Sequence, residues 1–312
     1  MRKNPFSIYD FLGYLFPGAL VLILIYFAYW FGGQLSCCCG CLSYRSVSLV
    51  DFQRFIGNLI SEIKLDETVL FVLVAYVLGH LAAYASCLTV ERLTIWLYGY
   101  PSQFLLGEEP KIGKPLTKKY WKESISKFRW NNFCIHSWKF LVLLFLLPIT
   151  FCCYFLGYLF NAQSLYIRSL DNYLVKLIEL KARRLFYKLG GDRNIDLANS
   201  KCDYHRIIYN YEYEIKEAHR HKMDNYVALY GFMRALTFIS NTIFMVGLIY
   251  IIFARLPLRE NWLFLLFFML LSYFLFMAFM KFYRRFTLES FMCLATDEGL
   301  GDIPDVPTIF TK

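Results

Sequence analysis

Five long runs of the sequence contain no Lys, Arg, Asp or Glu, and they constrain the fold more than any other feature. The runs cover residues 11–31, 69–90, 141–160, 235–254 and 262–280. A helix needs about 20 apolar residues to cross the hydrocarbon core of a bilayer, and each run meets or approaches that length. Only 18% of the residues are charged and 58% are hydrophobic, whereas soluble domains average roughly 25% and 45–50%. The sequence therefore predicts an all-α integral membrane protein with about five transmembrane helices.

The polar residues between these runs divide the chain into six parts. We expect the first two spans in residues 1–90, a basic polar loop in 91–138, a third membrane segment in 139–160, a helical polar module in 161–230, the fourth and fifth spans in 231–285, and a short tail in 286–312. The first run follows Arg2 and Lys3, as the core of a secretory signal would. It is longer than the roughly 7–15 residues of such a core and lacks a small-residue cleavage site. It therefore predicts a retained anchor.

The third segment has two interpretations that differ in topology. Residues 91–138 carry eight Lys and Arg residues and residues 161–228 carry twelve. Basic residues favour the cytoplasmic side of a membrane, yet five full spans place these two regions on opposite sides. A third segment that enters and returns on one side removes the conflict, and Pro148 and Gly157 could break its helix. We expect five spans, with four spans and a re-entrant third segment as the alternative.

Residues 161–230 show the pattern of two amphipathic helices. Leucines recur at helical spacing up to Leu189, and Gly190 and Gly191 then end the first helix. A second helix is predicted over 204–230, where Glu212 and Lys216 lie four residues apart in the order that favours an ion pair. The two helices would form a hairpin that projects from the membrane. This module is either a structural stalk or a sensor that meets a soluble partner.

A cluster of lysines marks the loop before the third segment. Basic residues near a membrane surface attract anionic lipid, and with nearby aromatic residues they can also bind phosphate and stack on bases. The lysines predict contact with lipid or with a nucleotide signal, and we do not expect nucleic-acid binding. The candidate residues are Lys111, Lys114, Lys118, Lys119 and Lys122.

Small residues repeat every four positions in the second apolar run. Ala75, Gly79, Ala83 and Cys87 would line one face of a helix, and such stripes let helix backbones approach closely. The stripe predicts a helix-packing face, either within one chain or between copies in a homo-oligomer. His80 lies beside it. An ionisable group at membrane depth is a candidate polar site, and its alternative role is a neutral hydrogen bond to a neighbouring helix.

The chemistry-bearing residues form no recognisable catalytic motif. No phosphate-binding glycine loop, nucleophile elbow or metalloprotease helix occurs, so we expect no enzyme, no catalytic residue and no cofactor. Cys38 and Cys41 have a zinc-ligand separation within a cluster that also holds Cys37 and Cys39. A second pair or a nearby His is missing. The sequence therefore predicts no metal site.

Two short stretches resemble a group of uncharacterised bacterial multi-span membrane proteins associated with anti-phage genes. They read IYDFLGYLFPG over residues 8–18 and YVLGH over residues 76–80. The resemblance covers about the first 90 residues. It implies an inner-membrane effector of anti-phage defence that oligomerises and disrupts the membrane. The alternative is a transporter or a membrane-anchoring subunit for soluble partners, although a transporter should contain related halves and interrupted helices.

Overall fold

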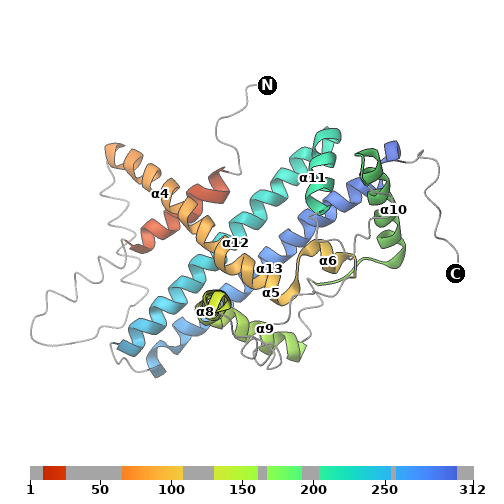
Figure 1. Cartoon of the computed structure of the whole chain (residues 1–312). Helices are drawn as coiled ribbons and strands as arrows, with labels where there is room; N and C mark the ends of the chain where they lie inside the picture. Colours follow the sequence, from red (N-terminus) through yellow and green to blue (C-terminus); the bar gives the residue numbers. More distant parts are fainter. Residues whose placement is uncertain are drawn as a thin grey trace, which may run out of the picture. The chain divides into compact units, whose positions relative to one another are not determined.

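The computed structural model of the chain describes residues 10–25, 65–107, 130–160, 167–191, 204–253 and 258–300. Every regular element within these ranges is a helix (Figure 1). The all-α class predicted from the sequence is therefore confirmed for this part of the chain.

The first helix covers Phe11–Ile25 and opens with a π-helical turn, η1 (Phe11–Leu15). The remaining elements are α4 (Leu65–Ser86), η2 (Cys87–Glu91), α5 (Arg92–Tyr98), α6 (Pro101–Leu105), α8 (Trp130–Phe145), α9 (Leu147–Phe160), α10 (Asn172–Lys188), α11 (Tyr204–Ile215), α12 (Glu217–Phe253), α13 (Leu258–Ala295) and η4 (Glu298–Leu300).

Three helical stretches are long and apolar enough to cross a membrane: Thr68–Leu105, Glu217–Ile252 and Asn261–Ala295. A fourth candidate is the pair Ser137–Phe145 and Leu147–Leu156, whose axes are bent by 74°. This bend falls at the predicted third segment, and it fits either a broken span or a re-entrant loop. The described residues thus contain three to four candidate spans. The helix Phe11–Ile25 is apolar but shorter.

The chain divides into two compact units. The first unit contains Met1–Val90, Leu144–Cys152 and Gly231–Phe276, and the second contains Glu91–Leu143, Cys153–Tyr230 and Met277–Lys312. Both α12 and α13 contribute residues to each unit.

In the first unit, the helix Phe11–Ile25 packs directly against α4. A Cβ atom on Gly79 would overlap the carbonyl oxygen of Tyr14, and one on Gly18 would overlap the carbonyl oxygen of Ala75. Two glycines therefore permit a backbone contact that any side chain would prevent. The rest of α4 is strongly apolar, and its exposed side chains include Val77 and Leu81.

The first unit also contains the break between α8 and α9. Pro148 has no N–H, so it cannot continue the backbone hydrogen bonds of α8. The Phe145 carbonyl next to the break accepts a hydrogen bond of 2.9 Å from the Asn241 side chain on α12. An unsatisfied carbonyl is costly in lipid, and Asn241 removes that cost. Between α12 and α13, the hydroxyls of Ser240 and Ser272 lie 3.0 Å apart.

In the second unit, α10 ends just before the glycines that the sequence predicts as its end. Asp171 caps its first turn by accepting a hydrogen bond of 2.9 Å from the Leu174 backbone N–H. Gly190 has φ of +83° just beyond its end, a conformation that favours glycine. Its apolar face buries Ile178 and Leu185. The predicted first helix of the polar module therefore forms.

The predicted helix over 204–230 is interrupted at Lys216. The chain forms α11 up to Ile215, and α12 then starts at Glu217 and continues through the fourth apolar run. Arg220 donates hydrogen bonds to the carbonyl oxygens of Tyr213 (2.5 Å) and Glu214 (2.6 Å). These bonds satisfy carbonyls that the end of α11 leaves free. The expectation of one continuous helix was wrong because this local capping ends it.

The start of the predicted polar loop is also helical. Residues 91–107 contain α5 and α6, and Leu93, Trp96 and Leu105 are buried there. Tyr98 is followed by Gly99, whose φ of 78° ends α5. Tyr100 is extended and leads into α6, whose first residue is Pro101. The loop expected from residue 91 is thus a buried helical segment up to Leu105.

Candidate functional site

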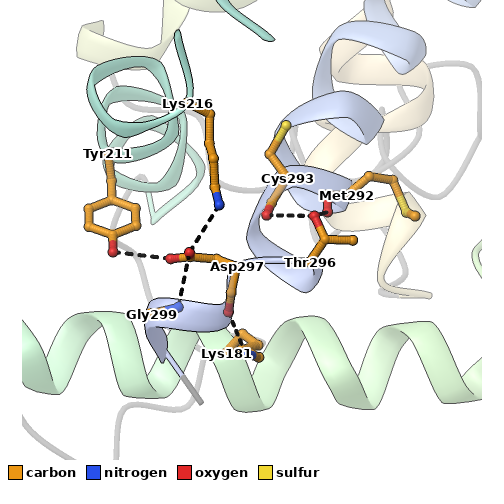
Figure 2. A network of polar contacts seen from close by, with 8 residues as sticks. All are labelled: Lys181, Tyr211, Lys216, Met292, Cys293, Thr296, Asp297 and Gly299. Carbon is orange, nitrogen blue, oxygen red and sulfur yellow. Dashed lines mark hydrogen bonds and ion pairs between the residues drawn. The ribbon is translucent and has the colours of Figure 1, made fainter. Parts of the chain in front are cut away.

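The carboxylate of Asp297 is the centre of a polar network in the second unit (Figure 2). Asp297 follows the end of α13 and is only 4% exposed. Its oxygens lie 3.2 Å from the Lys216 ammonium and accept a hydrogen bond of 3.2 Å from the Tyr211 hydroxyl. A third hydrogen bond of 3.3 Å comes from the Gly299 backbone N–H. The network joins α11, the break before α12 and the segment after α13.

The electrostatics of Asp297 follow from these contacts. Burial alone would oppose its ionisation, but the hydrogen bond and positive charge of Lys216, helped by Gly299 and Tyr211, hold its pKa below the ordinary value. Asp297 is therefore a stable carboxylate. Burial and the nearby negative charge of Asp297 raise the pKa of Tyr211 to about 12, so the phenol remains a hydrogen-bond donor.

Basic side chains of α10 hold the backbone next to Asp297. Lys181 donates a hydrogen bond of 2.6 Å to the Asp297 carbonyl oxygen (Figure 2). Arg184 donates one of 3.0 Å to the Leu300 carbonyl oxygen. Carbonyls after the end of a helix attract cations because the helix dipole is negative there. This contact attaches α10 to η4.

Glu212 is buried beside this network without a hydrogen bond. It is fully buried on α11, on the same face as Tyr204 and Ile208. Neither of its carboxylate oxygens has a hydrogen-bond partner. Burial and the negative charge of Asp297 raise the pKa of Glu212 to about 7, although Lys216 acts in the opposite direction. The sequence predicts an ion pair between Glu212 and Lys216. In the structure Lys216 pairs with Asp297 instead and donates its hydrogen bond to the Asp297 carboxylate.

A second polar group connects α12 to α13 in the same unit. The Glu289 carboxylate lies 3.3 Å from Nδ1 of His219 and 2.5 Å from the Lys222 ammonium. Cys293 is buried one helical turn after Glu289. A ring nitrogen of His219, a carboxylate oxygen of Glu289 and the Sγ atom of Cys293 all lie within 4.8 Å of one another. This group brings three different ligand types to one place.

The predicted small-residue stripe lies in the first unit. Ala75 and Gly79 are buried, and Gly79 lies directly against the helix Phe11–Ile25. Ala83 and Cys87 are partly buried farther along the same face. The stripe thus packs within one chain at its first half. This contact does not test whether copies associate.

His80 stacks on an aromatic ring from the first helix. Its ring centroid lies 3.8 Å from that of Tyr14, with 19° between the planes, and 4.6 Å from that of Tyr76. The imidazole is exposed overall. His80 is therefore a neighbour of the packing contact between the two helices.

Two groups of predicted residues lie outside the described residues. These are the lysines Lys111, Lys114, Lys118, Lys119 and Lys122, and the cysteines Cys37, Cys38, Cys39 and Cys41. Lipid or nucleotide binding by the lysines stays a prediction.

The polar groups around Asp297 and Glu289 were not predicted from the sequence. One signal was available: Glu289 and Cys293 are four residues apart, so a helix places both on one face. Glu212 gave a second signal, since it lies four residues after Ile208 on an apolar face. No sequence pattern identified Asp297, which meets Tyr211 across 86 residues.

Comparison with known proteins gives no further guide to the site. No family model, curated protein or solved structure matches the chain. The function is therefore argued from the described geometry and from the sequence.

Proposed function

We propose that this chain is a five-span inner-membrane effector of a prokaryotic anti-phage system. The polar groups of the second unit would receive a signal, and the apolar segments would assemble into an oligomer that disrupts the membrane. The five spans are the three long helical stretches, the bent pair α8 and α9, and the run at 11–31, of which the described part is the helix Phe11–Ile25. The sequence resemblance supports the assignment to defence.

The continuity of α12 and α13 carries the proposal. These helices have 37 and 38 residues, so each is roughly 55 Å long at 1.5 Å per residue. The hydrocarbon core takes up only about 30 Å. Each helix therefore has enough length for an apolar span and for the polar residues that meet at Glu289. A change at the polar groups would act directly on two membrane helices.

The outer face of α4 supports an assembly role. Large apolar side chains there are exposed, with Leu81 at 59% and Val77 at 58%. In a membrane this face contacts either lipid or a second copy. We assign this face of α4 to contact with a second copy in the active oligomer.

Membrane potential and phage plating test the effector function. The protein should be induced in bacteria alone and with candidate neighbouring genes, with and without phage. We expect depolarisation and reduced plating in at least one combination. Unchanged potential and plating in every combination would exclude the effector function.

Cysteine cross-linking tests assembly in the same cells. Leu81→Cys should give disulfide-linked dimers above the level that the ten native cysteines of the wild type produce. The matched control is Leu146→Cys, because Leu146 is fully buried. Equal dimer levels for both variants would argue against assembly through α4.

The bend between α8 and α9 favours a second candidate function. Transporters place discontinuous helices around a substrate site near the membrane midplane. Here the broken pair is bent by 74° and meets the buried Asn241 side chain. A transporter predicts solute flux into proteoliposomes without loss of membrane potential in cells. Depolarisation on activation distinguishes the effector from this alternative.

A further inference from the structure

The residues around Glu289 contain the ligand set of a metal site. Glu289 and Cys293 lie on one face of α13, and His219 faces them from the first turn of α12. Two ligands four residues apart on one helix and a third on a neighbouring helix form a common type of metal site, because helical spacing places both side chains on one face. All three ligand atoms lie within 4.8 Å of one another.

The distances suit a tetrahedral ion. Metal–ligand distances of about 2.0–2.3 Å place the ligand atoms of a tetrahedral zinc site roughly 3.3–3.8 Å apart. His219 Nδ1 and the Glu289 carboxylate already lie 3.3 Å apart. The Cys293 sulfur lies within 4.8 Å of both ligand atoms, so it must move closer to them to complete three corners. The fourth corner remains for water or another ligand.

The ligand chemistry selects the class of metal. A thiolate and an imidazole suit zinc and similar transition-metal ions, whereas magnesium and calcium prefer oxygen ligands. The nearby carboxyl group of Glu212 acts electrostatically on Cys293. It is fully buried and both of its oxygens lack a hydrogen-bond partner. A cation bound at Cys293 would favour the ionised form of this group.

Lys222 now supplies the positive charge at Glu289. Its ammonium lies 2.5 Å from the carboxylate, and its side chain is 52% exposed. The Glu289 side chain is only 13% exposed, so Lys222 is the partner that reaches solvent and the one that would leave when a dication arrives. A divalent metal ion at Glu289 would therefore replace the single positive charge of Lys222 with two positive charges.

We propose that His219, Glu289 and Cys293 bind a divalent transition-metal ion of the zinc class, which links α12 to α13. Binding releases the thiol proton of Cys293 to solvent, so affinity rises with pH. The site stands on its own geometry and does not depend on the proposed effector function.

Metal titration of the purified full-length protein in nanodiscs tests the site. Zn²⁺ affinity is measured by competition with a chromophoric chelator, and Co²⁺ reports its ligands by thiolate-to-cobalt charge-transfer absorption. Cys293→Ser should remove the part of this absorption due to the site and weaken Zn²⁺ binding at least tenfold. Glu289→Gln and His219→Asn should also weaken it. The controls are Cys87→Ser and His221→Asn, which leave all three ligands in place.

Lys222→Met provides a readout that misfolding cannot imitate. Removal of the competing ammonium should increase Zn²⁺ affinity severalfold. The positive charge of Lys222 repels the bound dication, and this effect should outweigh its stabilisation of the Cys293 thiolate. Cobalt absorption that is identical in wild type and Cys293→Ser would overturn the site, since other cysteines would then be the ligands. The absence of saturable Zn²⁺ or Co²⁺ binding would also overturn it. Depolarisation and phage plating are measured separately, so failure of the metal site leaves the effector test unaffected.

Discussion

The buried polar side chains of the first unit are all neutral among the described residues, whereas those of the second unit include carboxylates. The first unit buries Ser86, Thr150, Thr237, Ser240, Asn241 and Ser272. The second buries Glu212 and Asp297 together with three hydroxyl side chains. Both units are helical, so secondary structure does not explain this difference.

The difference between neutral and charged buried groups matters for the environment that each unit can occupy. A charge in hydrocarbon is expensive, and hydroxyl or amide groups can instead bond to helix backbone, as Asn241 does with Phe145. The Asp297 network needs a paired lysine and several donors to retain its charge. Neutral buried polar groups such as those of the first unit are the kind that a lipid environment allows, whereas the charged groups of the second unit need partners. Four substitutions test this difference.

Glu212→Gln should have the largest of the four effects, because it should abolish the pH dependence that Glu212 gives to the free energy of unfolding. The pKa of Glu212 is about 7 in the folded protein and about 4.3 in an unfolded chain. The unfolded state therefore loses its proton first as the pH rises, and wild-type stability should fall by about 3 kcal/mol between pH 5 and 8. Thermal unfolding in nanodiscs measures this slope, which the variant should lack. The exposed Glu214→Gln should retain it, and a wild-type slope in both variants would show that Glu212 does not titrate.

Gly79→Ala should destabilise the first unit by about 2 kcal/mol. The new Cβ would overlap the Tyr14 carbonyl oxygen, and backbone cannot move aside as a side chain can. Gly231→Ala is the matched control, since its Cβ meets no atom within 4 Å. The control should gain up to about 1 kcal/mol from helix propensity. Unfolding midpoints of the two variants give the comparison, and equal shifts would contradict the close helix contact.

Asp297→Asn should cost the second unit about 1–2 kcal/mol at neutral pH. The substitution removes the charge that pairs with Lys216, while the shape of the side chain is retained. The lowered pKa of Asp297 means that this loss is present at neutral pH and disappears as the pH falls below about 4. Urea or thermal unfolding at pH 3 and pH 7 measures it. The exposed Glu298→Gln serves as the control, and a similar loss there would refute the role of the network.

Asn241→Leu should have the smallest effect, about 1 kcal/mol. It removes the side-chain donor to the Phe145 carbonyl at the bend between α8 and α9. Thr242→Val is the control, because the Thr242 hydroxyl bonds only to its own helix at Phe238. Hydrogen exchange of the amides in α9 should increase in Asn241→Leu alone. Unchanged exchange would mean that the bend does not depend on this bond.

Local sequence signals predicted the helices because they depend on neighbours in the chain. Gly190 and Gly191 indicated the end of α10, whereas its start at the Asp171 cap was not predicted. The spans at 235–254 and 262–280 followed from uninterrupted apolar residues. The break at Lys216 was not predicted. The residues around it have the composition of an ordinary helix, and the Arg220 contacts that cap α11 form only in the folded chain.

The amino-acid sequence alone was enough to predict a helical protein with several segments that are long and apolar enough to cross a membrane, because this property depends mainly on composition and length. It also placed the small-residue stripe on one face of α4. The packing of the helices was needed to learn that Gly79 meets Tyr14, that Asp297 rather than Glu212 pairs with Lys216, and that His219 faces Glu289 and Cys293. These contacts join residues far apart in the chain, and their energies depend on distances and burial that exist only after the helices pack.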